Sequence, residues 1–366
     1  MAVWSDLPAD LMRSIDDKIL SYKDQVRCRC VCSSWRSALP EMTGSMPGLL
    51  VPLKSETQTG SRTPFGFIDP FEKKVHRLRF SYPRGTGMLF RGSCHGWVVS
   101  IEGSSIYVIN PLTGVHEMLP PIIELPDLRK FRPDTCTLRD YILDKVSFSS
   151  SPQSNNFVAV AIYGDRGSLA YCKRRDRQWT LIHHGGYSDF IFHGDQIYTV
   201  NGSGSLVVCD IQNQSPKVWE LVPSSLKRKR RFLSSNPSRL YLVESSGGLL
   251  MVQRIVSING IHYETLGFRV FKLDTSSREW HRIVSTGEDA LFLGWNVCLC
   301  SKLRGYGGDC IYFTHKNMVW RRRKMAYGPE ISVFNLSNGS FQDLPKQSSD
   351  LESVIWSPPV WFIPTY

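Results

Sequence analysis

The sequence lacks the features that would place the chain in a membrane or on a secretory route. Its 366 residues contain no apolar run close to the ~18 residues of a membrane-spanning helix. The chain opens with MAVWSDLPAD, which has an acidic residue where a secretory signal carries positive charge followed by apolar length. These absences predict an intracellular protein with no membrane partner, located in the nucleus, the cytoplasm or both.

The ten cysteines also lack the spacing of a metal site. Cys28, Cys30 and Cys32 alternate within an expected helix, so they point to different faces and cannot close one tetrahedral zinc site. Cys298 and Cys300 form a C-x-C pair in an expected strand, without a second pair at metal-site spacing. We therefore predict buried, reduced thiols, no metal and no cofactor.

A set of residues typical of an active site is missing as well. Residues 92–96 have the G-x-C-x-G form of a nucleophile elbow, but their surroundings predict strand, turn, strand instead of the strand-to-helix turn that this motif needs. His183 and His184 form an adjacent pair and His193 stands apart from them. The three histidines do not have the fixed spacing of a set of metal ligands. The sequence predicts no catalytic residues and a protein that is not an enzyme.

The charge is moderately basic, with 44 basic and 33 acidic residues and a net charge of +11. Much of the excess lies in two runs, residues 321–324 and the patch formed by Lys227, Arg228, Lys229, Arg230 and Arg231. Either run could contact an acidic partner or nucleic acid, and the patch could be a nuclear localisation signal, although a solvated loop explains both more simply. Stacking aromatics are mostly absent around the patch, so nucleic acid is an unlikely partner.

From Trp4 to about Leu39 the apolar pattern is helical, unlike the rest of the chain. Asp6 can cap a helix that Pro8 begins. The apolar positions recur at helical spacing, at Leu11, Ile15 and Ile19 and then at Cys28, Val31 and Trp35. Helices this short cannot bury their apolar stripes alone, so the segment needs a partner surface.

The same residues resemble the F-box motif over its whole length. The matching positions are, in order, Leu7-Pro8, Leu11, Ile15, Leu20, Asp24, Arg27, Arg29, Val31-Cys32 and Trp35-Arg36. The one departure is Gln25-Val26, which replaces a leucine-rich pair and keeps the apolar character at its second position. The resemblance implies that four of these residues help dock the Skp-type adaptor of an SCF ubiquitin ligase, and through it a cullin: Leu7, Pro8, Leu11 and Ile15. It implies that Val31, Cys32 and Trp35 hold the helices together and complete the docking face.

After a Pro/Gly/Ser-rich linker at residues 40–48, the chain predicts only short β-strands separated by turns. Six segments share one pattern, an apolar strand, a polar turn and a second strand with an aromatic or imidazole side chain. Equivalent positions in the six segments are Phe67, Val108, Tyr171, Val208, Val270 and Val333. The spacing is typical of propeller blades with insertions at 125–140, 223–237, 256–266 and 316–329. We predict a mainly β chain, with an F-box at residues 1–39 and a propeller of about six blades at 49–366.

A propeller must close its ring, which removes exposed sheet edges. Ile355-Trp356 and Val360–Phe362 are apolar enough to pair with Leu49–Leu53, so we expect the two ends of the repeat region to close it.

The β segments are similar to those of the plant F-box proteins that carry domain of unknown function 295. The shared motifs include GSCHGWVVSIEG, NPLTG, YLVESSGGLLMV, FRVFKLD and the closing PPVWF. This resemblance implies a kelch-like propeller that binds a target protein for a ubiquitin ligase, and it does not name the target. The alternative is a nuclear scaffold or nucleic-acid-binding propeller that acts through its basic loops, which leaves the N-terminal helices unexplained.

Overall fold

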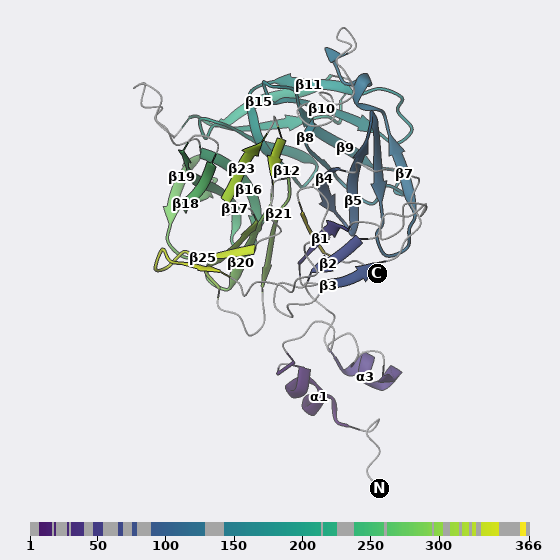
Figure 1. Ribbon diagram of the computed structural model, residues 1–366, viewed down its shortest axis with the longest axis vertical. Coiled ribbons are helices and arrows are strands. Elements are labelled where there is room, and N and C mark those ends of the chain that lie inside the picture. The colour runs from purple at the N-terminus through teal and green to yellow at the C-terminus, as the bar shows by residue number, and fades with distance from the viewer. Residues whose placement is uncertain are drawn as a thin grey trace.

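The computed structural model describes residues 7–16, 18–19, 28, 31–39, 47–53, 65–68, 75–78, 89–128, 143–213, 215–224, 238–259, 262–294, 296–302, 308–314, 317–321, 324–326, 331–343 and 359–363. Within these residues the strands form six sheets, arranged as the blades of a propeller around a central axis (Figure 1). Two short helices, α1 (Ala9–Asp16) and α3 (Ser33–Ala38), lie outside the ring. The predicted architecture is confirmed.

Four of the blades are four-stranded and antiparallel, with their strands in order from the innermost outward. Blade 1 holds β27 (Val360–Phe362), β1 (Gly48–Pro52), β2 (Phe65–Ile68) and β3 (Val75–Leu78). Blade 2 holds β4 (Leu89–Cys94), β5 (Trp97–Glu102), β6 (Ser105–Ile109) and β7 (His116–Leu119), and the 3-10 turn η2 (Ile122–Glu124) follows it. Blade 3 holds β8 (Leu143–Phe148), β9 (Val158–Tyr163), β10 (Ser168–Lys173) and β11 (Thr180–His184). Blade 4 holds β12 (Tyr187–His193), β13 (Gln196–Asn201), β14 (Leu206–Asp210) and β15 (Lys217–Val222).

The last two blades are larger. Blade 5 holds β16 (Ser238–Ser245), β17 (Gly248–Asn259), β18 (His262–Asp274) and β19 (Glu279–Ile283), extended by β23 (Asn317–Arg321) and β24 (Lys324–Ala326). Blade 6 holds β21 (Cys298–Lys302), β20 (Asp289–Leu293), β22 (Cys310–Thr314), β25 (Ile331–Asn335) and β26 (Phe341–Asp343). Strand β20 is parallel to β22, so it is an additional strand between β21 and β22.

The six positions that the sequence aligns fall on equivalent strands. Five of them lie on the third strand of blades 1 to 5, namely β2, β6, β10, β14 and β18. The sixth lies on β25, which is fourth in its blade because β20 is inserted before it. The repeat recognised in the sequence is therefore the repeat of the fold.

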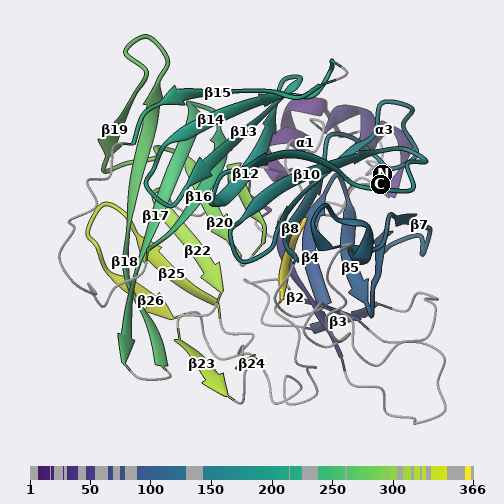
Figure 2. The ribbon, with the colours of Figure 1, turned by 90° about the horizontal axis from the view of Figure 1, so that it is seen from above.

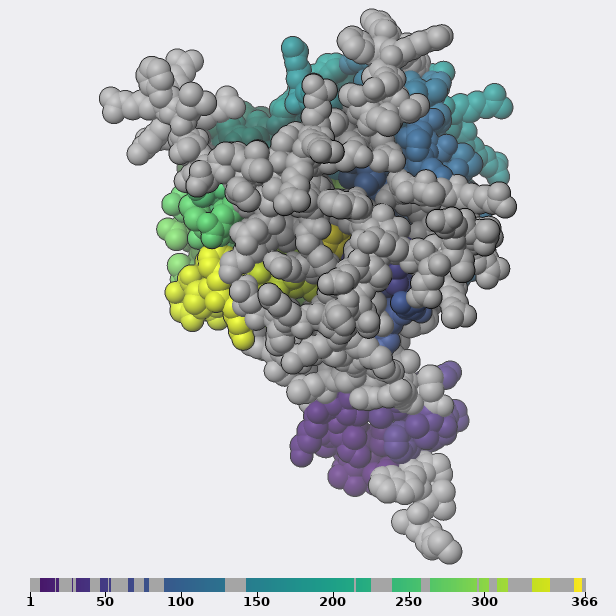
Figure 3. Space-filling view, in the orientation of Figure 1, coloured from purple at the N-terminus to yellow at the C-terminus, as the bar shows by residue number. Residues whose placement is uncertain are grey.

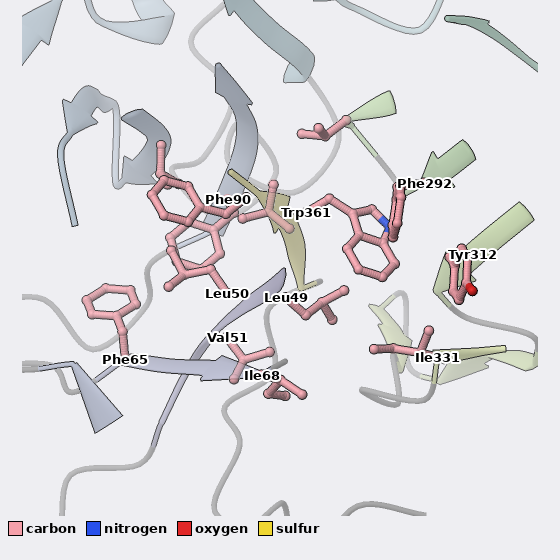
Figure 4. Packing of buried hydrophobic residues seen from close by; sticks show 14 of the residues in the cluster. Leu49, Leu50, Val51, Phe65, Ile68, Phe90, Phe292, Tyr312, Ile331 and Trp361 are labelled. Carbon is pink, nitrogen blue, oxygen red and sulfur yellow. The ribbon is translucent and has the colours of Figure 1, made fainter. Parts of the chain in front are cut away.

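The ring closes between the two ends of the repeat region, as predicted. Strand β27 pairs antiparallel with β1, with Leu49 opposite Trp361 and Leu50 opposite Val360. Figure 4 shows Trp361 beside Phe292 of blade 6 and close to Leu49 of blade 1, so the indole is part of a core shared by the first and last blades. The other predicted closing pair, Ile355-Trp356, lies outside the described residues.

Two of the predicted loop insertions are strands in the structure. Residues 256–259 and 262–265 of this insertion continue the antiparallel pairing of β17 with β18, so the insertion lengthens a hairpin. Residues 316–329 contribute β23 and β24, and β23 pairs with the tip of that hairpin, with His262 opposite Val319. The backbone groups of the lengthened hairpin are satisfied by strand pairing, which a solvated loop would not provide. Figure 2 shows the β23–β24 hairpin on the side of the ring opposite to α1 and α3.

The aromatic residue that follows the polar turn in the repeat joins neighbouring blades. The indole N–H of Trp179 donates to the Pro120 carbonyl at 2.8 Å, and that of Trp280 donates to the Gly204 carbonyl at 3.1 Å. Both indoles are buried, so each polar N–H needs a partner, and the preceding blade supplies it. These contacts hold the blades as a rigid frame for the loops.

Candidate functional site

The first candidate site is the surface of the two N-terminal helices, and α1 divides its side chains sharply between two faces. Met12 and Asp16, one turn apart, are buried. Leu11 and Ile15, also one turn apart, remain 50% and 39% exposed. One stripe of α1 is therefore buried within the protein, and a second, apolar stripe faces solvent.

The helix α3 begins with an unusual cap. The Cys32 sulfur accepts the Trp35 backbone N–H at 3.4 Å, which satisfies one of the free donors at the helix start. Trp35 is half-buried, and Leu39 at the other end of the helix is buried. Arg13 of α1 donates from Nε to the Ala38 carbonyl at 3.3 Å and so joins the two helices.

The residues predicted to bind an adaptor are solvent-accessible to different degrees. Val31, directly before the Cys32 cap, is 60% exposed, Pro8 is exposed and Leu7 is half-buried. Figure 3 shows the helical residues, in purple, projecting below the propeller. Three large apolar side chains are thus exposed on this small segment, Leu11, Ile15 and Val31. The sequence did not lead us to predict that Met12 and Asp16 form the buried face of α1. The signal available was their helical spacing, four residues apart.

The predicted basic patch, Lys227–Arg231, lies outside the described residues. The second basic run contributes Arg321 to the end of β23 and Lys324 to the start of β24, where the two are paired across the hairpin. This hairpin is on the far side of the ring from the helices (Figure 2).

The G-x-C-x-G segment forms a strand, turn and strand, as predicted. Strands β4 and β5 meet at His95 and Gly96, both of which have positive φ, at 50° and 74°. Burial raises the pKa of Cys94, but the hydrogen bond with His95 and the charges of His95 and Lys145 more than offset it, so the thiol pKa lies below its usual value. The hydrogen bond with Cys94 in turn raises the pKa of His95. Both shifts favour the thiolate of Cys94, which is the form of a cysteine that reacts.

We expect Cys94 and Cys300, which are both partly exposed, to be alkylated at different rates. Burial raises the pKa of Cys300 to about 12, and Asp289 acts in the same direction. Because only the thiolate reacts, and each pKa unit changes its fraction about tenfold, iodoacetamide at neutral pH should modify Cys94 at least about tenfold faster. Mass spectrometry of the folded chain over time measures both rates. A His95→Gln variant should slow Cys94 alone, and equal rates in the parent chain would contradict the assignment.

The histidines considered as metal ligands each have a separate partner. His183 shares a hydrogen bond with the Tyr187 hydroxyl at 2.8 Å, His184 with the Ser168 hydroxyl at 2.9 Å, and His193 with the Glu244 carboxylate at 3.0 Å. Within the part of the chain that the structure describes, no group of three His, Cys, Asp or Glu side chains is placed to hold a metal ion. No helix of that part is long and apolar enough to span a membrane.

Comparison with known families gives two matches. Residues 67–335 match the KIB1-4 beta-propeller family and residues 18–41 match the F-box domain. The F-box match includes Val31, Cys32 and Trp35, whereas Leu7–Ile15 precede it.

Comparison with curated proteins finds relatives in Arabidopsis thaliana that extend along the whole chain. The F-box protein SKIP23 is 22% identical over 99% of this chain and 96% of its own length. The F-box protein At4g35733 is 24% identical over 93% of this chain and 96% of its own. Among solved structures, TolB from Acinetobacter baumannii aligns with 93% of this chain and 73% of its own at 12% identity, with a TM-score of 0.40.

Proposed function

This chain belongs to the F-box proteins that carry a KIB1-4 β-propeller, and on that premise we propose that it is the substrate receptor of an SCF-type ubiquitin ligase. In this role the N-terminal helices bind a Skp-type adaptor and through it a cullin, and the propeller holds a target protein. The chain supplies no chemistry of its own. It raises the local concentration of target lysines near the ubiquitin-conjugating machinery. The proposed place of action is the nucleus, the cytoplasm or both.

The observation that carries the adaptor half of the proposal is the exposed apolar surface of Leu11, Ile15 and Val31. An isolated helix pair gains nothing from apolar side chains in water, and burying such side chains against a partner contributes roughly 25 cal/mol per Å². The buried Met12 and the Arg13–Ala38 hydrogen bond keep the pair folded while that surface faces outward.

The target half of the proposal rests on the frame of the propeller. Blades joined by shared clusters of buried apolar side chains and by the Trp179 and Trp280 hydrogen bonds hold variable loops in fixed positions. The β23–β24 hairpin stands on the opposite side of the ring from the adaptor-binding helices (Figure 2). A target bound to that side or to the ring's circumference can be held while the adaptor is engaged.

We expect a Leu11→Asp/Ile15→Asp/Val31→Asp variant to lose adaptor binding by at least about 100-fold, because charges replace the central contacts of the docking surface. Affinity for a purified Skp-type adaptor, measured by calorimetry with the full chain, checks this.

The matched control is Val115→Asp, which places the same charge on an apolar residue of the propeller that is 42% exposed. It should bind the adaptor like the parent chain. The proposal fails if the parent chain does not bind any Skp-type adaptor, or if the triple variant, with an unchanged far-UV circular dichroism spectrum, binds equally well.

A further inference from the structure

A half-open pocket of about 570 Å³ lies between blades 4 and 5, a volume within the range of specific ligand sites. Its walls come from the end of β12, the β16–β17 turn and the end of β18, together with residues of β13, β15 and β19. No feature of the adaptor-docking surface is part of it.

The pocket walls are mainly apolar. Leu221 of β15, Leu249 of β17, Leu273 of β18 and Ile283 of β19 line it, and Tyr198 of β13 adds an aromatic ring. This apolar lining would favour a buried aliphatic or aromatic side chain of a ligand.

The apolar surface continues beyond the pocket to Trp219. Tyr198 is paired with Val208, and Val208 with Trp219, so all three side chains lie on the same face of blade 4. Trp219 is 41% exposed, and exposed tryptophan is enriched at protein-binding sites. A ligand that covers both the pocket and Trp219 is longer than a single side chain.

The charged side chains of the pocket include the carboxylate of Asp274 and, as its positive group, the ammonium of Lys272. The Lys272 side chain is exposed, and a Cβ added at Gly247 would stand 3.2 Å from Nζ, so the ammonium lies over the β16–β17 turn. Within the described part of the chain, the lysines that form ion pairs with carboxylates are Lys145 and Lys302, which leaves Lys272 available to a ligand.

Asp274 lines the pocket and Glu244 lies near it, and both carboxylates have partners of their own. Backbone N–H groups of Ser276 and Ser277 donate to Asp274, which lowers the pKa of this carboxyl and holds the carboxylate on its own turn. His193 contacts the Glu244 carboxylate at 3.0 Å. The ionised Asp274 carboxylate also lies 3.8 Å from His281, so within the described residues Lys272 is the charged group of the lining without a hydrogen-bonded or ion-pair partner.

We infer that this pocket receives a short extended segment of the target protein, in which a large apolar side chain stands beside an acidic one. The apolar side chain enters between Leu249 and Ile283, the carboxylate pairs with the Lys272 ammonium, and the flanking chain lies across Trp219. Charge complementarity selects an acidic peptide over a basic one, and the apolar extension selects a peptide over a small anion. The inference rests on the proposed function, since it names where the receptor holds its target.

The test is a selection of phage-displayed random peptides on the intact chain, followed by fluorescence anisotropy with the enriched peptides as synthetic probes. We expect the enriched peptides to share an acidic residue next to a large apolar one. A Lys272→Glu variant should bind them at least about tenfold more weakly, whereas Lys272→Arg should retain most of the affinity. Binding to the parent chain should weaken as salt is raised.

The matched control is Lys173→Glu. Lys173 occupies the same position of the repeat in blade 3, is exposed and lies outside this pocket, so the variant should bind the peptides like the parent chain. Lys272→Glu should still bind the adaptor, and the Leu11, Ile15 and Val31 variant should still bind the peptides. Failure of the adaptor experiment and failure of this one are therefore distinguishable.

The inference is overturned if the selection enriches no peptides, if the enriched peptides lack the acidic and apolar pair, or if Lys272→Glu, folded as judged by its thermal midpoint, binds them as tightly as the parent chain.

Discussion

Asp189→Ala should destabilise the propeller by about 3–5 kcal/mol, because it leaves a buried lysine without its counter-charge. Asp189 is 3% exposed and Lys145 is 7% exposed, and Lys145 Nζ donates to Asp189 Oδ1 at 2.5 Å. For a chain of this size, that loss would lower the midpoint of thermal unfolding by roughly 4–7 °C. Circular dichroism at one fixed scan rate measures it.

The contacts of Asp189 explain why the effect should be large. Its Oδ2 atom accepts the Leu242 backbone N–H at 2.8 Å and the Cys298 thiol at 3.5 Å, while Lys145 comes from β8. The four residues belong to the innermost strands of blades 3, 4, 5 and 6, so one carboxylate joins four of the six blades around the central axis. The Asp189→Ala variant also leaves the Leu242 N–H buried without a partner.

Two further variants test this interpretation. Lys145→Met combined with Asp189→Ala removes the stranded charge and should recover part of the lost stability. Glu288→Ala removes a solvent-exposed partner of Lys302, at 3.3 Å, and should change stability by less than about 1 kcal/mol. A double variant as unstable as the sum of its two single variants would rule out the coupling of Lys145 and Asp189.

Trp361→Ala should destabilise the ring by about 3–5 kcal/mol, the range for truncating a large aromatic residue in a core. Trp361 is fully buried, its ring packs edge-on against Phe292 at 5.0 Å, and its carbonyl accepts the Ser93 hydroxyl at 2.5 Å. The substitution therefore opens a cavity where β27 closes blade 1 and contacts blades 2 and 6. Thermal and urea unfolding of the full chain measure the loss.

The matched control is Trp219→Ala, the same truncation at a position that is 41% exposed, which should have a much smaller effect. Trp361→Phe should also be milder than Trp361→Ala, because it keeps most of the ring and removes an indole N–H that is buried without a hydrogen-bond partner among the described residues. A Trp361→Ala variant as stable as Trp219→Ala would show that ring closure at β27 contributes little.

Most of the N-terminal segment could be predicted from the sequence, because helical periodicity depends on residues that are close together along the chain. Helical spacing placed Leu11 and Ile15 on one stripe, and α1 has both on its exposed face. Local spacing could not say which stripe is buried, because Leu11 and Met12 are equally apolar and adjacent. That choice depends on tertiary contacts, among them the contact of α1 with α3.

The β repeat could be predicted from the sequence for a similar reason. Strand, polar turn and strand recur within a few tens of residues, and each unit pairs with itself, so the pattern survives in the sequence. The lengthening of the β17–β18 hairpin was not readable, because its tip is stabilised by β23, which lies far along the chain from it. An excess of residues over the repeat length is compatible with a loop or with a longer strand.

The sequence by itself determined the helical N-terminus, the β repeat with about six units and the strand that closes the ring, because these follow from periodicity and neighbouring turns. Only the tertiary structure decided what faces the central axis and what lines the pocket between blades 4 and 5. The strands that contain Lys145 and Asp189 have sequences that do not distinguish them from the other strands. Lys272 occupies the same position of its repeat as Lys173, so its place in the repeat does not predict that it lines a pocket. Asp189 meets Cys298 across 109 residues and Ser93 meets Trp361 across 268. Contacts over such separations depend on the closure of the whole ring, which no local pattern encodes.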